Sequence, residues 1–373
     1  PALRRLAPMP TPTPTIHTAQ TTLLSASEGL RRVVCAVEID TDRHRSTNVT
    51  DSTRAVAPHR RAPAPFRRVR TGPTLSPMSE NTPHTPRIGT GSPVWIDYTA
   101  ANFARQKAFY SELFGWSFED QGEEFGHYCM IRAGDHVIGG AMDADLTAAH
   151  TGEPAQPAAW SVYLKTDDID ATAAATREHG GQVVVEPMGV GPLGRMALAM
   201  SAGGEAVGFW QPGEFAGHDL PLAEGTSVWF EVMSTDYDAD AEFYRQVAGW
   251  DVAPMGPTGE TATDDDEAGD DETGQGAAGA SDDADAAGDM PRYATNFAGE
   301  RATSGLCDAS AWLPEGTPSY WRVYFQVADT PAALATIEKH GGRVLDGPMD
   351  SPFGRVTTVA DPAGATFQLN QPL

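Results

Sequence analysis

This sequence of 373 residues contains few cysteines, few lysines and no long apolar run. The three cysteines, Cys35, Cys129 and Cys307, form no CxxC pair, and their odd number argues against a disulfide framework. We therefore expect reduced thiols in a cytoplasmic protein. No apolar run approaches the roughly 18 residues that a membrane-spanning helix needs, so we predict no such helix and no membrane partner.

The positive charge is scarce and unevenly placed. The chain has a formal net charge of −25, with 26 Lys and Arg against 51 Asp and Glu. Residues 1–88 hold 13 Arg, no Lys and 6 acidic residues, whereas residues 260–289 hold 12 acidic residues and no basic one. Phosphate binding needs clustered cations, so the acidic body of the chain argues against a nucleic-acid partner.

Two segments lack the apolar pattern of a folded domain. Residues 1–77 mix Pro-Thr repeats with Arg clusters, and Met78 begins a stretch that resembles an ordinary N-terminus. We predict a disordered leader over 1–88 with the native start at Met78, the alternative being an organelle transit peptide. Residues 257–290 are rich in Asp, Gly, Ala and Thr, so we predict a disordered acidic insert. The ligand spacing of a calcium loop is absent from it.

The rest of the chain contains the same pattern twice. Val94-Trp95-Ile96-Asp97 recurs as Val228-Trp229-Phe230-Glu231, and Phe109-Tyr110 with Gly115-Trp116 recurs as Phe243-Tyr244 with Gly249-Trp250. Two further matches, Tyr128 with Tyr293 and Gly140 with Gly305, share one larger offset in the sequence, and later matches follow in the same order. Collinear matches of this kind indicate a duplicated domain.

Each copy shows the same predicted order of elements, described here for the first. Alternating apolar residues predict a strand over 93–99, and Asn102 is expected to cap a helix over 103–114 that ends at Gly115. Asp167-Asp168 is expected to open a second helix that ends at His179-Gly180-Gly181. The remaining predicted strands are 116–119, 128–132, 136–142, 160–165, 182–185, 195–200 and 206–210. Each copy is thus two strand–helix–three-strand units.

This pattern resembles the vicinal oxygen chelate superfamily, which includes glyoxalase I, bleomycin-resistance proteins and extradiol dioxygenases. The resemblance lies in the run Phe109 to Trp116, the helix opening Asp167 to Asp170, and the terminal Asp361-Pro362-Ala363-Gly364-Ala365-Thr366-Phe367-Gln368-Leu369. It implies an α+β fold of two tandem domains, each an incomplete eight-stranded barrel of two βαβββ units. The expected boundaries are 93–212 for the first domain, 213–226 for a linker and 227–373 for the second.

The resemblance also locates three positions per domain at which metal-dependent members carry His, Gln or Glu. In this chain these positions hold Trp95, Ser161 and Gly208 in the first copy and Trp229, Arg322 and Gln368 in the second. Tryptophan, serine and glycine are unsuited to hold a metal there, and an arginine cation would repel one. We therefore expect no cofactor, the alternative being a divalent metal held weakly by an acid together with Gln368.

Strand parity indicates what faces the barrel interior instead, because residues two apart point to the same side. The predicted inward set combines aromatic side chains with one carboxylate per copy: Trp95, Asp97, Ser161, Tyr163, Gly208 and Trp210, then Trp229, Glu231, Arg322, Tyr324, Gln368 and Asn370. This set suits a small organic ligand with a polar end. In the structural alternative the aromatic residues are barrel core, and Glu231 with Arg322 forms an ion pair.

Three functions are compatible with these residues. The first is binding of a small molecule without a tightly held metal, with sequestration as in the bleomycin-resistance branch. The second is a glyoxalase-like isomerase or lyase, or a dioxygenase-like oxidoreductase, in which Asp97 or Glu231 acts as general base. The third is a non-catalytic interaction scaffold, since fold alone does not select a function. We expect a monomer or homodimer.

Overall fold

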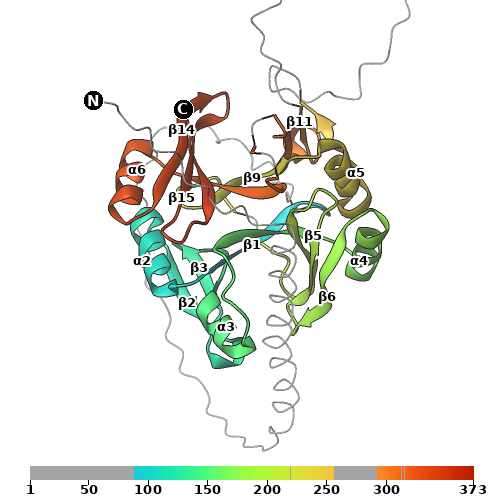
Figure 1. Cartoon of the computed structure of the whole chain (residues 1–373), viewed down its shortest axis with the longest axis horizontal. Coiled ribbons are helices and arrows are strands. Elements are labelled where there is room, and N and C mark those ends of the chain that lie inside the picture. Colours follow the sequence, from blue (N-terminus) through green and yellow to red (C-terminus); the bar gives the residue numbers. More distant parts are fainter. Residues whose placement is uncertain (1–87, 219, 256–291, 312, 315) are drawn as a thin grey trace, which may run out of the picture.

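The computed structural model describes residues 88–218, 220–255, 292–311, 313–314 and 316–373. The predicted disordered leader, apart from residue 88, and the predicted acidic insert lie outside these residues. The described part contains two eight-stranded sheets with helices on their outer sides (Figure 1). Within it, no helix is both long and apolar enough to cross a membrane.

Repeat 1, residues 93–212, has the predicted alternation of strands and helices. Its strands are β1 (Pro93–Ala100), β2 (Ser117–Asp120), β3 (Cys129–Ala133), β4 (His136–Asp143), β5 (Ala159–Lys165), β6 (Gln182–Val190), β7 (Gly194–Met200) and β8 (Ala206–Pro212). Its α-helices are α2 (Phe103–Phe114), α3 (Ala144–Thr151) and α4 (Ile169–Glu178), and a short 3-10 turn, η2, spans Glu123–Phe125.

Repeat 2, residues 227–373, follows the same order without a counterpart of α3 among its described residues. Its strands are β9 (Ser227–Ser234), β10 (Ala253–Pro254), β11 (Tyr293–Thr295), β12 (Ser304–Asp308), β13 (Tyr320–Gln326), β14 (Arg343–Ser351), β15 (Gly354–Ala360) and β16 (Thr366–Gln371). Its helices are α5 (Tyr237–Ala248) and α6 (Thr330–Lys339), with a 3-10 turn η3 (Gly299–Arg301).

The strand order confirms the predicted pairs of βαβββ units. The sheets run β2-β3-β4-β1-β5-β8-β7-β6 and β10-β11-β12-β9-β13-β16-β15-β14. Within each unit the first strand pairs in parallel with the last, and the two units meet through the antiparallel pairs β1–β5 and β9–β13. Each repeat is therefore an incomplete eight-stranded barrel with a pseudo-twofold arrangement.

One local prediction was wrong, and one helix was missed. Asn102 does stand at the start of α2, but it adopts a left-handed conformation with φ 52° and its side chain caps no amide. Its own N–H instead donates to Asp145 Oδ2 over 2.8 Å. The sequence also gave no sign of α3, whose only fully buried residue is Ala144 and which Asp143 caps. An exposed helix of this length carries little periodic apolar pattern.

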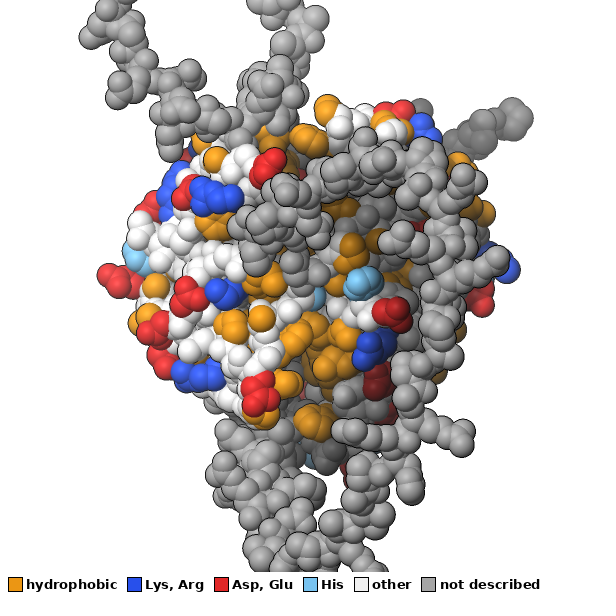
Figure 2. All heavy atoms as spheres, turned by 180° about the vertical axis from the view of Figure 1, so that it is seen from behind, with side chains coloured by type: hydrophobic (Ala, Val, Ile, Leu, Met, Phe, Trp, Pro, Cys, Tyr) orange, Lys and Arg blue, Asp and Glu red, His pale blue; other side chains and the backbone are white. Residues whose placement is uncertain are grey.

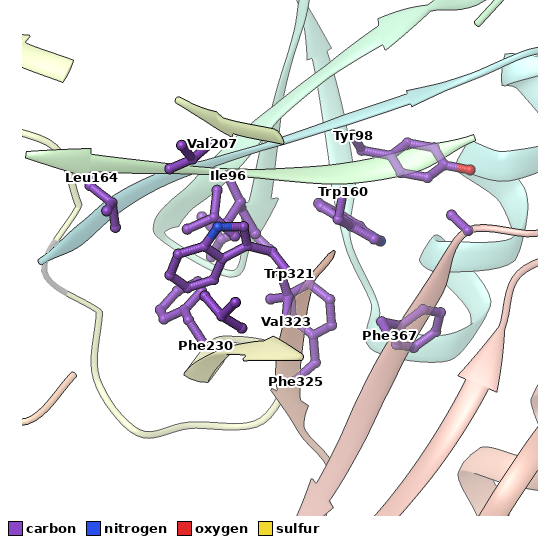
Figure 3. Close-up of a cluster of buried hydrophobic side chains, with 14 of the residues drawn as sticks. Ile96, Tyr98, Trp160, Leu164, Val207, Phe230, Trp321, Val323, Phe325 and Phe367 are labelled. Carbon is purple, nitrogen blue, oxygen red and sulfur yellow. The ribbon is translucent and has the colours of Figure 1, made fainter. Parts of the chain in front are cut away.

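The main hydrophobic core lies between the two repeats and extends under their helices. Figure 3 shows Ile96, Tyr98 and Trp160 of repeat 1 facing Trp321, Phe325 and Phe367 of repeat 2. Strand β5 packs against β13, while α2 packs against α6 and α4 against α5, so that each lateral helix pair in Figure 1 combines both repeats. The repeats therefore share one core, which favours folding as a unit.

The terminal motif that begins at Asp361 contributes to this contact. Asp361 Oδ1 accepts hydrogen bonds from the amides of Ala363, Gly364 and Ala365, at 2.8, 2.7 and 2.9 Å. Its other oxygen, Oδ2, accepts from the hydroxyls of Tyr98 and Tyr110 in repeat 1. A residue that shapes a turn in one repeat therefore also binds the other.

The described cysteines are buried, and the described surface charges are of both signs. Cys129 and Cys307 are buried free thiols, and burial raises the pKa of Cys307 to about 12, so both stay protonated at neutral pH. On the face drawn in Figure 2, Lys and Arg side chains are interspersed with Asp and Glu. Most described arginines form ion pairs with carboxylates, as at Arg132–Glu119 and Arg177–Glu186.

Candidate functional site

The central strands of each repeat present different side chains to their two faces. Ile96, Tyr98 and Val162 point from β1 and β5 into the shared core. The alternate residues Trp95, Tyr163 and Trp210 belong to a separate cluster on the inner face of the barrel. The parity expectation therefore agrees with the structure, which brings the predicted residues of β1, β5 and β8 together through the register Trp95–Tyr163–Gly208.

Asp97 is the polar centre of the inner face in repeat 1. Asp97 is only 8% exposed to solvent. Its Oδ1 accepts hydrogen bonds from Trp95 Nε1 at 3.0 Å and from Tyr128 Oη at 2.5 Å. Trp95 Nε1 also lies 3.1 Å from Tyr128 Oη, which closes a triangle of three polar groups. Ser161 lies directly opposite Asp97 on β5.

Burial controls the ionisation of this cluster. It raises the pKa of Asp97, and hydrogen bonds from Tyr128, Tyr163 and Trp95 offset part of that rise. The pKa values of Tyr128 and Tyr163 are raised well above the usual 10, first by burial and then by the charge of Asp97. Both phenols therefore remain hydroxyl donors, and the carboxyl group is a better proton acceptor than an exposed aspartate.

A glycine makes room for this arrangement in each repeat. A Cβ atom on Gly140 would lie 1.5 Å from Tyr128 Oη and 2.6 Å from Asp97 Oδ1. A Cβ on Gly305 would lie 2.0 Å from Tyr293 Oη. The tyrosine–glycine pairs were visible in the sequence as part of the duplication, but their contact with the carboxylate was missed. Tyr128 and Tyr293 are thus site residues that strand parity alone did not identify.

Repeat 2 has a corresponding cluster, in which a glutamate takes the place of the aspartate. Glu231 is 7% exposed, and its Oε2 accepts from Tyr324 Oη at 2.6 Å. Trp229 Nε1 donates to Tyr293 Oη at 3.1 Å, the same contact that Trp95 makes with Tyr128. The charge of Glu231, after burial, raises the pKa values of Tyr293 and Tyr324 well above 10. One acid, one tryptophan and two tyrosines are therefore common to both repeats.

The positions that the family resemblance assigns to metal ligands do not fit a metal in this structure. Trp95 directs an N–H toward Asp97, and a side chain on Gly208 would collide with the ring of Tyr163 at 2.2 Å. In repeat 2, Gln368 exchanges hydrogen bonds with Thr358 at 2.9 and 3.1 Å. No group of three His, Cys, Asp or Glu that could hold an ion occurs in the part of the chain that the structure describes.

The remaining predicted residues of repeat 2 are polar and unevenly paired. Arg322 donates through Nε and Nη2 to Tyr320 Oη, at 3.2 and 2.9 Å. The ion pair with Glu231, proposed as the structural alternative, is absent: among the described residues no carboxylate forms an ion pair with Arg322. Asn370 Oδ1 is buried without a hydrogen-bond partner.

The segment between the repeats covers the inner face of repeat 1, which the sequence did not indicate. Phe215 packs edge-on against Trp95, with ring centroids 5.2 Å apart, and its carbonyl accepts from Trp210 Nε1 at 2.9 Å. His218 lies 5.9 Å from Trp95, and its N–H donates to Val94 O. Burial lowers the pKa of His218 to about 4, so the imidazole is neutral at pH 7.

Comparison with known proteins identifies the family. The model of the Glyoxalase/Bleomycin resistance protein/Dioxygenase superfamily matches residues 92–200 and 226–369, which together form more than half of the chain. Among curated relatives, "Putative glyoxylase CFP32" of Mycobacterium tuberculosis is 29% identical over 76% of this chain and 95% of its own length. "Anthracycline biosynthesis protein DnrV" of Streptomyces peucetius is 27% identical over 76% of this chain and 94% of its own length.

Solved structures with a similar chain course include a glyoxalase and a dioxygenase. The Mn(II)-bound glyoxalase from Novosphingobium aromaticivorans is 15% identical with a TM-score of 0.48, covering 76% of this chain and 83% of its own. The 2,3-dioxygenase LapB from Pseudomonas sp. KL28 is 12% identical with a TM-score of 0.49, covering 76% of this chain and 93% of its own.

Proposed function

Because the chain belongs to the Glyoxalase/Bleomycin resistance protein/Dioxygenase superfamily, we propose that it binds a small organic molecule on the inner faces of its barrels, without the usual three-ligand metal set. One observation carries the proposal: each repeat holds a buried carboxylate beside a tryptophan and two tyrosines. Aromatic walls with a few fixed polar groups are the usual lining of small-molecule sites.

The energetics of the carboxylates support a binding role. Removing an ionised carboxylate from water is costly unless hydrogen bonds replace the lost hydration. Asp97 and Glu231 differ in length, yet both keep hydroxyl donors in contact. A purely apolar inner face would avoid this cost, so the retained acid supplies an acceptor for a polar end of the ligand. The name of the Streptomyces relative refers to an anthracycline, itself a small organic compound, and this agrees with the class of ligand.

The test combines metal analysis with ligand binding. Protein purified without chelator is analysed for Fe, Ni, Zn and Mn, and a panel of small organic compounds is screened by native mass spectrometry. We expect less than stoichiometric metal and at least one bound compound whose affinity falls by about tenfold or more in the variant with Asp97→Ala and Glu231→Ala, as expected for loss of a charged hydrogen-bonding partner. Stoichiometric metal at the acids would contradict the proposal. Binding that is unchanged with both acids replaced would favour the scaffold function.

A second function, an isomerase or lyase of the glyoxalase type, is favoured by the ionisation of Asp97. Burial raises the pKa of this carboxyl group, which strengthens it as a base toward a carbon-bound proton. Such an enzyme exchanges the substrate proton with solvent, so 2-oxoaldehyde–thiol adducts incubated in D₂O are expected to gain deuterium. Asp97→Asn keeps the shape and removes the base; exchange that persists in this variant at the wild-type rate excludes the role.

A further inference from the structure

The two inner faces differ in what covers them. In repeat 1, the ring of Phe215 occupies the space against Trp95 and lies 6.0 Å from Trp210. The segment is fixed there by two backbone contacts, Trp210 Nε1 to Phe215 O and His218 N to Val94 O. The ring of Phe215 therefore fills the space against Trp95 and Trp210. We call this space, and the matching space against Trp229 in repeat 2, the aromatic seat of each repeat.

The matching seat in repeat 2 has no such cover among the described residues. Trp229 makes no ring contact comparable to that of Trp95 with Phe215 within this part of the chain. Met188 packs into the inner-face cluster of repeat 1, whereas its counterpart Met349 is 62% exposed. Phe353, on the hairpin between β14 and β15, is 63% exposed. Within the described residues, this apolar surface is thus more exposed in repeat 2 than in repeat 1.

Repeat 2 also carries larger polar groups than repeat 1 at two matched positions. Arg322 stands where repeat 1 has Ser161, and Asn370 stands where it has Trp210. Arg322 lies on β13, which pairs with the strand of Trp229, and Asn370 lies on β16, which pairs with β13. Seven other described arginines form ion pairs with carboxylates, namely Arg132, Arg177, Arg195, Arg245, Arg292, Arg301 and Arg355. The guanidinium of Arg322 is partly buried, donates hydrogen bonds to the hydroxyl of Tyr320 and belongs to the residue directly opposite Glu231 across β13 and β9. It therefore retains N–H donors for a planar anion.

We propose that the inner face of repeat 2 is the binding site for an aromatic carboxylate. Its ring packs against Trp229, as Phe215 packs against Trp95, and its carboxylate accepts hydrogen bonds from Arg322. The buried, unpartnered Asn370 Oδ1 accepts from a hydroxyl substituent on the ring. This inference rests on the proposed function, which places the ligand on the inner face. It adds the class of the ligand and the repeat that binds it.

The probes are 4-hydroxybenzoate and its neutral analogue 4-hydroxybenzyl alcohol, measured by calorimetry and by saturation-transfer NMR on the full chain. We expect one 4-hydroxybenzoate per chain, bound more tightly than the alcohol. Arg322→Gln is expected to weaken binding of the carboxylate by about tenfold or more, the scale of a lost charged hydrogen bond, and to leave binding of the alcohol unchanged. Arg322→Lys keeps the positive charge and is expected to retain part of the affinity, which separates loss of the cation from loss of the fold.

Arg195→Gln is the matched control, because Arg195 is an exposed arginine of repeat 1 paired with Asp170. It is expected to bind both probes as the wild type does. Equal affinity of the two probes, or unchanged carboxylate binding in Arg322→Gln, overturns the inference. If other compounds bind in a manner that depends on Glu231 but neither probe does, the inference fails and the proposed function stands. If no compound of the panel binds, both fail.

Discussion

Trp116 donates its indole N–H to the carbonyl oxygen of Gly225 over 2.8 Å, and Trp250 makes the same contact with Gly91, also over 2.8 Å. Each bond runs from the end of a first helix in one repeat to the residues that precede the first strand of the other. The duplication seen in the sequence is therefore also a reciprocal contact in three dimensions, and the repeats hold each other in place.

Replacing either tryptophan by phenylalanine should weaken this contact. Trp116→Phe and Trp250→Phe each remove one buried hydrogen bond and part of a buried ring, so each is expected to lower the free energy of unfolding by about 1–3 kcal/mol. Urea unfolding followed by circular dichroism measures it. Because the core is shared, a single transition is expected in all three proteins; separate transitions for the two repeats would contradict the reciprocal contact.

The glycine beside each carboxylate cluster should be intolerant of a side chain. Gly140→Ala places a Cβ within 1.5 Å of Tyr128 Oη, and Gly305→Ala places one within 2.0 Å of Tyr293 Oη. Each change is expected to destabilise the protein by about 1–3 kcal/mol, the usual cost of overpacking. Gly89→Ala is the control, since the nearest atom to its Cβ is Ser92 Oγ at 3.9 Å. Equal melting temperatures for all three variants would disprove the close packing.

The buried acids at the repeat interface should make stability depend on pH. Burial, followed by the charge of Asp240, raises the pKa of Glu205 from 4.5 to about 8. The folded state thus holds this proton more tightly than the unfolded state. Its contribution to stability is complete below pH 4.5 and is lost as the pH rises through about 8. The unfolding free energy of the wild type should therefore fall, relative to that of Glu205→Gln, as the pH rises across this window.

Urea unfolding at several pH values between about 5 and 8 measures this difference. The glutamine still offers an oxygen to Tyr244, which donates to Glu205 over 2.6 Å. Glu214→Gln, at an exposed position, serves as the control and should follow the wild type. Parallel curves for the wild type and Glu205→Gln would show that Glu205 does not carry the effect.

Removing the ring that covers repeat 1 should create a second aromatic seat. Phe215→Ala vacates the space beside Trp95 and Trp210, at an expected cost of about 1–3 kcal/mol because Phe215 is only partly buried. Repeat 1 has Ser161 where repeat 2 has Arg322, so the new seat should favour the neutral 4-hydroxybenzyl alcohol. Calorimetric titration should show its stoichiometry rise from one to two per chain. An unchanged stoichiometry would contradict the equivalence of the two seats.

Local sequence patterns were sufficient for most of the elements and failed where burial is slight or the backbone unusual. The strand over 93–99 and the helix over 103–114 were predicted within a residue, because each buries one regular face. The exposed α3 was missed for the opposite reason. Asn102 has a residue type that favours helix caps, but its left-handed backbone turns the side chain away from the helix amides.

The candidate site was predicted in part. Parity placed Asp97 with Trp95, since residues two apart in a strand share a face whatever surrounds them. Parity did not identify Tyr128, because the contact of Tyr128 with Asp97 depends on how β3 pairs with β4 and on the space left by Gly140. Arg322 was assigned to the same face as Glu231, yet its hydrogen-bond partner proved to be Tyr320.

The sequence by itself determined the duplication and the order of strands and helices. These properties depend on residue type and on the period of each element, which are local. The tertiary structure alone decided that the repeats share one core, that Phe215 covers the inner face of repeat 1, and that Arg322 donates to Tyr320 and forms no ion pair with a carboxylate of the described residues. Those facts depend on contacts between residues far apart in the chain, whose geometry no single element specifies.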